Sequence, residues 1–517
     1  MLPAIVNRLW IGTQWLNARR FAAALWQPRR TQIEILRRYV ERNELTEFGR
    51  RYRFSDVRSP LEFRSRVPLS RFEDYIEAIE RIRGGEPDVL TADRVRRLEP
   101  TSGTSQARKL IPWTASLQGE LRRAVGPWLV DIARSHPGIR NGRSWWAVSP
   151  ALPGEDEGGA VAVGFDSDRD YLGGSLGWLT GKILVDCDDL RLTADIDSFR
   201  RRTALRLLAA DDLCLISVWH PSFFSLLLDY MLEHWSTLLD DVAGGREAKV
   251  HARRISELRN ADPTQPATVW PQLKLISCWA EGHAEAPARD LQRRFANVCV
   301  QSKGLLATEG VVSVPWQGSR PLAVRSHFFE FLDGGGEARF AWELEKDATY
   351  SVVITTGGGL YRYCLDDEVR VDGFVGETPD LRFVGRRGSV SDLCGEKLSE
   401  AFVAEALSRL LPTHAPHAAF ALLSPYDDGE ATVGYRLYVD DAGPADWSDS
   451  LEAELARNPH YANCVYVGQL QPVVVVNAGA EARARFLARM NELGQRLGDI
   501  KPVALSARTD WHGFLGK

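Results

Sequence analysis

Residues 273–306 contain the pattern that most limits how this chain can fold, because an apolar run, a helical stretch and a second apolar run follow one another. Residues 273–279 predict a buried strand, residues 286–296 predict a helix, and residues 298–306 predict a second strand or its approach. A strand, a helix and a strand in this order form a βαβ unit, whose two strands lie parallel in one sheet. Similar alternation from about residue 90 to 380 predicts the α/β class.

The length of the chain indicates more than one domain. A chain of 517 residues is too long for one compact core and favours two or three domains. Near residue 386 the pattern changes to short alternating strands and helices over about 130 residues, a size typical of a small α+β domain. We therefore expect a large domain over residues 1–385 and a small one over residues 386–517, with the hinge at Gly385-Arg386-Arg387-Gly388.

Charge and cysteine content exclude several classes of protein. The 64 basic and 69 acidic side chains give a net charge of −5, which provides no overall basic field for nucleic acid. No uncharged apolar run of about 18 residues occurs, so no membrane-spanning helix is expected. The seven cysteines are an odd number and form no C-x-x-C pair, which favours reduced thiols in a cytoplasmic protein over a disulfide framework or a zinc ribbon.

The first 33 residues carry five arginines and no acidic residue. A transit peptide is also rich in arginine and poor in acidic residues. However, the helical pattern continues without a break through residues 32–39, so we expect a helix that packs on the body of the protein. A removed targeting segment and a helix lying on a membrane surface are the alternatives.

The strongest local signal is a loop of small hydroxyl residues and one glycine that ends in Arg108 and Lys109. Glycine allows close approach of the backbone, and hydroxyl and N–H groups donate to phosphate oxygens, so this loop is suited to bind a polyphosphate. Lys109 would then neutralise phosphate charge. The spacing does not match a Walker A loop, and an ordinary Ser/Thr/Gly turn is the alternative. The loop residues are Ser102, Gly103, Thr104 and Ser105.

Two further loops place acidic residues after predicted strands. Thr308 and Glu309 follow the second strand of the βαβ unit, at the sheet edge where ligands of open α/β folds bind. A carboxylate there is suited to hold Mg²⁺ beside a phosphate, and a solvated loop acid or a helix cap is the alternative. Residues 354–369 place three glycines before Asp366 and Asp367. An aspartate in that place suits ribose hydroxyls, and a glycine-rich hairpin with surface acids is the alternative.

These three loops, in this order and followed by a small C-terminal domain, resemble the GH3 family of acyl-acid amido synthetases within the adenylate-forming superfamily. Residues 43–49, 63–68 and 85–91 are also similar to GH3 landmarks. The resemblance extends from about residue 30 to the end of the chain. It implies a large N-terminal adenylate-forming domain with parallel and mixed sheets, which binds ATP and the acyl acid, and a small mobile C-terminal domain that closes over the active site.

The resemblance implies roles for the residues that match its motifs. The family's S-G-T-[ST] loop binds ATP phosphates and matches residues 102–105, with Lys109 as the trailing lysine. The family's [ST]-E motif binds phosphate and Mg²⁺ and matches Thr308 and Glu309. ATP and Mg²⁺ are therefore the expected cofactors, with Glu309 as the metal ligand.

The ribose and adenine contacts follow the family pattern only in part. Asp367 and Arg386 match positions that contact ribose. Leu306 stands where most members have an aromatic residue that stacks on adenine, and Asp366 stands where glycine is usual. These two departures leave a non-catalytic binding protein for nucleotides or acyl ligands as one alternative.

Two lysines of the C-terminal block match catalytic positions of the family. Lys397 follows the hinge, and Lys501 lies near the end of the chain. A lysine that reaches the α-phosphate would stabilise charge as pyrophosphate leaves, whereas a solvated surface lysine is the alternative.

The implied reaction has two steps. A carboxylic acid attacks the α-phosphate of ATP to form an acyl-adenylate and pyrophosphate. An amine, for which an amino acid is expected, then takes the acyl group as an amide, and AMP leaves. Transfer of the acyl group to coenzyme A is the second alternative.

Overall fold

The computed structural model describes most of the chain in a series of segments. They comprise residues 2–100, 109–147, 159–164, 181–187, 189–190, 193, 195–386, 390–391, 393, 396, 398–427, 433–441, 443, 447–466, 470–493, 495, 500 and 503–516. Among the helices of these segments, none is long and apolar enough to cross a bilayer.

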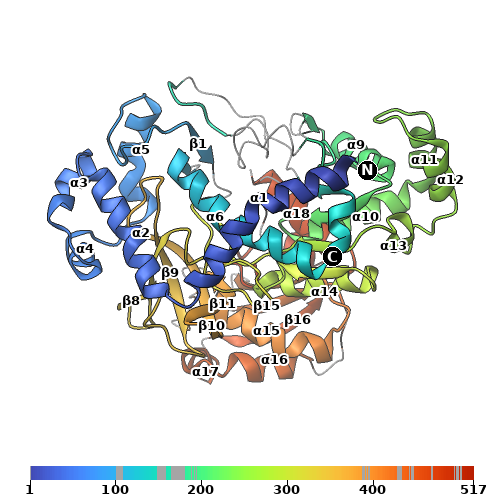
Figure 1. Ribbon diagram of the computed structural model, residues 1–517. Helices are drawn as coiled ribbons and strands as arrows, with labels where there is room; N and C mark the ends of the chain where they lie inside the picture. The colour runs from blue at the N-terminus through green and yellow to red at the C-terminus, as the bar shows by residue number, and fades with distance from the viewer. Residues whose placement is uncertain are drawn as a thin grey trace.

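Helices form the first part of the chain, as the sequence predicts. The longest of them, α1, runs diagonally across the molecule and packs along α6 (Figure 1). Pro28 occupies the first turn of α2, where its missing N–H costs no helical hydrogen bond. The elements are α1 (Leu2–Ala24), α2 (Pro28–Asn43), α3 (Glu47–Arg51), η1 (Phe54–Asp56), α4 (Pro60–Arg66), η2 (Phe72–Tyr75) and α5 (Ile76–Arg83).

One buried glutamine ties these first helices to a much later part of the chain. Gln32 of α2 is fully buried, and its Nε2 donates to the carbonyl oxygens of Val324 and His327 at 2.8 and 2.7 Å. Its Oε1 accepts the N–H of Phe329 at 2.8 Å. The side chain therefore satisfies three backbone groups that would otherwise be buried without a partner.

A four-stranded parallel sheet forms the first core, with the strand order β3-β4-β5-β6. Leu275 pairs with Cys299 and Cys278 pairs with Ser302 across β5 and β6, and α14 connects these two strands. This arrangement confirms the predicted βαβ unit and the α/β class. The elements are β3 (Arg143–Trp146), β4 (Leu213–Ser217), β5 (Leu275–Cys278), η5 (Gly282–Ala284), α14 (Glu285–Arg294) and β6 (Cys299–Ser302).

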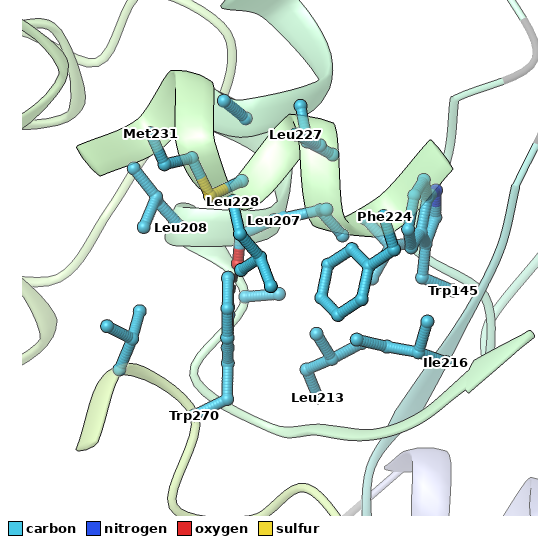
Figure 2. Close-up of a cluster of buried hydrophobic side chains, with 14 of the residues drawn as sticks. Trp145, Leu207, Leu208, Leu213, Ile216, Phe224, Leu227, Leu228, Met231 and Trp270 are labelled. Atoms are coloured by element: carbon cyan, nitrogen blue, oxygen red, sulfur yellow. Dashed lines mark hydrogen bonds between the residues drawn. The ribbon is translucent and has the colours of Figure 1, made fainter. Parts of the chain in front are cut away.

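Helices and long loops cover this parallel sheet with a large apolar cluster. Figure 2 shows Phe224 and Met231 of α10 packed with Trp145 and Ile216 of the sheet and with Trp270. Trp145 and Phe224, two of the aromatic residues of the central region, are therefore core residues. The surrounding elements are η3 (Pro137–Asn141), α9 (Ile196–Ala209), α10 (Pro221–Glu233), α11 (Trp235–Ala243), α12 (Ala252–Arg259) and α13 (Pro266–Val269).

A five-stranded antiparallel sheet with the order β11-β10-β9-β7-β8 encloses the second core. Strands β1 and β2 form a separate antiparallel pair. They flank residues 101–108 in the sequence, and α6 begins directly after β2. The elements are β1 (Arg97–Pro100), β2 (Leu110–Trp113), α6 (Ala115–Ser135), β7 (Phe328–Leu332), β8 (Ala338–Phe340), β9 (Thr349–Thr355), β10 (Tyr363–Val375) and β11 (Thr378–Arg386).

The last part of the chain combines strands and helices as expected for an α+β block. Strand β15 pairs antiparallel with β14 and parallel with β16 in a three-stranded sheet. Helices α15 and α16 pack on it through residues such as Leu407 and Leu451. The elements are β12 (Val390–Ser391), β13 (Leu398–Ser399), α15 (Glu400–His414), β14 (Ala421–Asp427), β15 (Val433–Val439), α16 (Trp447–Leu455), α17 (Pro459–Tyr466), β16 (Gln471–Asn477), α18 (Ala482–Glu492) and α19 (His512–Leu515).

Candidate active site

A hollow that is open to solvent lies beyond the carboxyl ends of β5 and β6. It contains about 400 Å³ of empty space, part of which is open solvent. Ligands of open α/β sheets bind at this edge. The residues that line the hollow are Trp279, Ala280, Glu281, Ser302, Gly304, Leu305, Leu306 and Phe383.

Thr308 and Glu309 form the tip of a tight turn directly beside this hollow. Leu306 pairs with Val311, and the backbones of Ala307 and Gly310 exchange hydrogen bonds of 2.9 and 3.2 Å. Both tip residues are half-buried. Only Thr308 and Glu309 separate the hydrogen-bonded residues Ala307 and Gly310. The turn therefore fixes the backbone from which these two side chains extend beside the hollow.

The carboxylate of Glu309 carries its charge close to the start of β10. Burial raises the pKa of the Tyr363 hydroxyl, and the negative charge of Glu309 raises it further. The turn at 308–309 therefore lies within electrostatic range of the first residue of β10, which follows the glycine-rich loop.

Asp367 and Arg386 lie opposite each other in neighbouring strands. The antiparallel register of β10 and β11 pairs Asp367 with Arg386. Asp367 is only 2% exposed. The two residues that match ribose contacts are nearly 20 positions apart in the sequence, and the pairing of the strands makes them direct neighbours.

Of the remaining predicted site residues, only Lys109 lies within the described segments. Lys109 directly precedes β2, is half-buried and has its Nζ 5.8 Å from the centre of the Phe72 ring. The other phosphate-loop residues and both candidate lysines lie outside the described residues. These are Ser102, Gly103, Thr104, Ser105, Lys397 and Lys501.

The departure from glycine at Asp366 has a conformational explanation. Asp366 has φ +62°, in the left-handed region that glycine adopts freely and that aspartate tolerates better than most residues. Its carboxylate accepts a hydrogen bond from Nη1 of Arg71 at 2.7 Å. This position requires a left-handed backbone conformation. Aspartate can adopt that conformation and also forms an ion pair with Arg71.

The Tyr-Arg pair before Asp366 supports the loop from within the protein. Arg362 is buried and donates from Nε and Nη2 to the two carboxylate oxygens of Glu330 at 2.8 and 3.1 Å. Its Nη1 donates to the carbonyl oxygen of Val67 at 2.7 Å. The Tyr361 hydroxyl donates to the carbonyl oxygen of Leu90. The side chains of Tyr361 and Arg362 are therefore both hydrogen-bonded in the interior of the protein.

Leu306 shares the hollow with two aromatic side chains from other elements. Trp279 follows β5, and Phe383 belongs to β11. The Trp279 ring lies 5.8 Å from that of Trp219, which follows β4 and is partly exposed. The hollow therefore presents aromatic surface although position 306 itself is aliphatic.

Sequence patterns do not predict the buried pair of Glu120 and His327, which braces two of the site loops. Both side chains are fully buried, and His327 Nδ1 lies 2.9 Å from the Glu120 carboxylate. His327 Nε2 accepts the N–H of Val311 at 3.1 Å, so the proton of the neutral ring is on Nδ1. The carboxylate also accepts the N–H of Gly357 at 3.1 and 3.0 Å.

Helix α6 connects this pair to the segment that follows the phosphate-loop sequence. Thr114 caps α6 by accepting the N–H of Leu117, and its hydroxyl donates to the carbonyl oxygen of Gly357 at 2.8 Å. The glycine-rich turn is thus held through both its N–H and its carbonyl. A histidine and a glutamate 207 positions apart give no signal that a sequence pattern could detect.

The residues at the hollow fit a nucleotide and a magnesium ion. Mg²⁺ usually binds through one or two carboxylates together with substrate phosphates, so Glu309 at the rim is a sufficient protein ligand. The described residues contain no cluster of three or more potential metal ligands, and a nucleotide-linked ion does not require one. The aromatic surface of the hollow suits a base, and the Glu309 carboxylate beside it suits a metal-bound phosphate, whereas Asp367 lies in β10 outside the lining of the hollow.

Comparison with known proteins identifies relatives of this arrangement. The model of the GH3 family N-terminal domain matches residues 17–300, and the model of the GH3 family central domain matches residues 321–386. An indole-3-acetic acid-amido synthetase of Arabidopsis thaliana, GH3.4, is 24% identical over 461 residues, which are 80% of this chain and 74% of that protein. The jasmonoyl–L-amino acid synthetase JAR6 of Nicotiana attenuata is 22% identical over 413 residues, 71% of each chain.

A solved structure shares the fold over nearly its whole length. The acyl acid amido synthetase AtGH3.15 in complex with 2,4-DB superposes with a TM-score of 0.83 at 19% sequence identity. The match covers 97% of this chain and 95% of that one. It supports the mixed α/β architecture described above.

Proposed function

Because the chain belongs to the GH3 family, we propose that it is an ATP-dependent ligase that adenylates a carboxylic acid and transfers the acyl group to an amine. The amine is an amino acid, and the products are an amide, AMP and pyrophosphate. Relatives that conjugate indole-3-acetic acid and jasmonic acid support an amide product over a coenzyme A thioester.

The observation that carries this proposal is the convergence of separate segments of the chain on one hollow. Leu306 lines the hollow and begins the turn that contains Glu309, and Phe383 of β11 brings to the same hollow the strand whose Arg386 pairs with Asp367. A site with these parts holds a nucleotide with its phosphates towards the turn at 308–309.

Each part of the site has a proposed role in binding ATP. Thr308 donates its hydroxyl to a phosphate oxygen, and the Glu309 carboxylate binds Mg²⁺. The bound ion would neutralise phosphate charge as pyrophosphate leaves. Asp367 accepts hydrogen bonds from ribose hydroxyls, and Arg386 contacts the ribose from the neighbouring strand.

We propose that the phosphate loop completes this arrangement. We assign phosphate binding to Ser102, Gly103, Thr104 and Ser105, with Lys109 as an accompanying cation. The support is that the strands flanking the loop lead directly into α6, whose Thr114 and Glu120 hold the glycine-rich turn near the site.

The C-terminal block supplies the last catalytic group in this proposal. Residues 386–517 form a mobile domain that closes over residues 1–385, and Lys501 or Lys397 then reaches the α-phosphate. A cation there stabilises the charge that develops during adenylation. Closure also excludes water, which would otherwise hydrolyse the acyl-adenylate.

We also propose that the protein acts in the cytoplasm. None of the cysteines in the described segments forms a disulfide bond. Thiols stay reduced in that compartment, whereas secreted proteins usually oxidise such residues.

The decisive experiment measures pyrophosphate release from ATP and Mg²⁺ over a panel of carboxylic acids. Each acid is tested alone, with a mixture of amino acids and with coenzyme A, and the products are analysed by mass spectrometry. Release that increases with amino acids and yields an amide mass supports the proposed ligase.

Two other results would overturn the proposal. Release that responds to coenzyme A and yields a thioester would assign the protein to the thioester-forming branch. Saturable ATP binding in a direct titration, without pyrophosphate release from any acid of a broad panel, would indicate a binding protein.

A further inference from the structure

The helix α1 has an apolar outer face that no described part of the protein covers. Its inner face packs on the body through Val6, Trp10 and Phe21, which are buried. Figure 1 shows α1 running along the surface of the molecule rather than between layers. The outer face consists of Leu2, Ile5, Leu9, Trp15 and Leu16, whose side chains are between 53% and 62% exposed.

The spacing of these residues places most of them on one stripe. At about 100° per residue, positions 2, 5, 9 and 16 fall within an arc of about 60°, which is centred roughly 100° around the helix from the buried residues Val6, Trp10 and Phe21. Trp26, directly after the helix, is 65% exposed. A solvent-facing helix normally presents polar residues on its outer side, so four exposed aliphatic side chains on one stripe, with Arg20 at its C-terminal end, indicate a binding surface.

The charged side chains of α1 itself are all basic, whereas the exposed Glu377 lies beside Leu25 just after the helix. The first 33 residues contain five arginines and no acid, and the first acidic residue of the chain, Glu34, pairs with Arg30. Arg8, Arg19 and Arg20 are exposed on α1 itself, and the guanidinium of Arg19 stacks over the Trp15 ring at 4.9 Å. A second copy of this face would bring like charges together.

A nearby half-buried arginine, Arg325, lies within the same group of cations. Burial lowers the pKa of Arg325 to about 10, with further lowering by the charges of Arg123, Arg20 and Arg38. Arg325 Nη1 donates to the side-chain oxygen of Asn17 on α1 at 2.7 Å. Cations crowd together beneath and beside α1, so an anionic partner gains energy from this side of the molecule.

We propose that the outer face of α1 docks the protein on the surface of an anionic lipid bilayer. Leucine and isoleucine side chains enter the boundary between headgroups and acyl chains, Trp15 and Trp26 lie at the interface, and the arginines contact lipid phosphates. The helix lies in the plane of the membrane and does not cross it. This docking is separate from the proposed ligase reaction and uses none of its site residues.

The experiment measures co-sedimentation of the full chain with large vesicles of phosphatidylcholine, with and without about 30% phosphatidylglycerol. We expect binding to the anionic vesicles only, with a marked decrease in 0.5 M salt. Leu9→Asp should lower the partition coefficient at least about tenfold. Leu61→Asp is the matched control, because Leu61 is 65% exposed on α4 and should leave binding unchanged.

Charge is tested separately by the triple substitution Arg8→Gln, Arg19→Gln and Arg20→Gln. It should weaken binding to anionic vesicles by about a hundredfold, since each surface cation contributes about fivefold. Pyrophosphate release without vesicles should stay at the wild-type rate in every variant, which shows that each variant is folded.

Three results would overturn the proposal. Binding to neither type of vesicle would exclude a lipid surface, and equal binding to both would exclude the role of the arginines. A dimer in light scattering that Leu9→Asp converts to a monomer would show that a second copy of the chain covers this face.

Discussion

His327 donates its Nδ1–H to the carboxylate of Glu120 across 2.9 Å, in a part of the protein that excludes solvent. The same carboxylate accepts the N–H of Gly357, and the other ring nitrogen accepts the N–H of Val311. One pair of side chains therefore fixes the turn that follows β9 relative to the turn that carries Glu309.

Removing the carboxylate of this pair should destabilise the whole fold. Glu120→Ala leaves the Gly357 N–H and the His327 Nδ1–H buried without their acceptor, so the free energy of unfolding should fall by about 2–4 kcal/mol. Urea denaturation measures the loss. Glu41→Ala, which breaks only an exposed pair with Arg37, should change stability by less than about 0.5 kcal/mol. Equal effects of the two substitutions would contradict the bracing role.

The conformation of Asp366 predicts an unusual order of substitutions. Asp366→Gly relieves the strain of φ +62° while losing the ion pair with Arg71, so its stability should stay within about 1 kcal/mol of wild type. Asp366→Val should cost about 1–2 kcal/mol, because a branched side chain does not tolerate the left-handed region. Thermal or urea unfolding of both variants tests this order, and a valine variant as stable as the glycine variant would refute it.

The buried ion pair of Arg362 and Glu330 should not tolerate a conservative exchange. Arg362→Lys keeps the charge but loses the planar fork that binds both carboxylate oxygens and the Val67 carbonyl. We expect a loss of about 3 kcal/mol in the free energy of unfolding. Arg370→Lys, in an ion pair with Asp347 that is far more exposed, is the control. A lysine variant at 362 with wild-type stability would show that the fork is not needed.

Glu309 should be required for catalysis and dispensable for folding. Glu309→Gln keeps the shape of the side chain but removes the charge proposed to bind Mg²⁺, so ATP-dependent pyrophosphate release should fall by about a hundredfold or more. The side chain is half-buried at the tip of a turn, so the melting temperature should change by no more than about 2 °C. Release at the normal rate would remove Glu309 from the metal site.

Buried thiols predict loss of stability at alkaline pH. Burial raises the pKa of Cys187, Cys214 and Cys278 to about 12 each, whereas an unfolded thiol titrates near about 8.5. Their contribution is complete below pH 8.5. It is lost progressively towards pH 12, because only the unfolded chain releases these protons in that window.

Urea midpoints between pH 7.5 and 10.5 measure this dependence. Cys278→Ala should make the slope shallower by up to about 1.4 kcal/mol per pH unit above pH 8.5. Cys299→Ala should have less effect on the slope, because Cys299 is exposed. Identical slopes for wild type and Cys278→Ala would contradict the titration of a buried thiol.

Local patterns in the sequence predict the backbone of the fold well. The βαβ unit between residues 273 and 306 is confirmed, because short apolar runs around an amphipathic helix have few other stable arrangements. The second strand ends at Ser302, earlier than the apolar run suggests, because Gly304 has φ +77° and brings the chain so close to Ser313 that a Cβ at position 304 would lie 2.5 Å from the Ser313 carbonyl oxygen. Such a close approach depends on a segment that follows later.

The candidate site is predictable only where a motif stays within one loop. The pairing of Asp367 with Arg386 follows from strand register, which the sequence does not specify across β10 and β11. The Glu120–His327 pair depends on the packing of α6 against the approach to β7. The reason for an aspartate at position 366 follows from its backbone angle φ, which the sequence does not give. From the sequence alone, an aspartate at a position where glycine is usual suggests a damaged site.

The three hydrogen bonds of Gln32 have a consequence for how this protein folds during its synthesis on the ribosome. The partners of Gln32 lie 292 to 297 positions later in the chain. At about 5–20 residues per second, they leave the ribosome about 15–60 s after Gln32 itself. The side chain of Gln32 must wait for that period without its three partners. Chaperones that hold the emerging N-terminus should therefore raise the yield of native protein more than those that act after release.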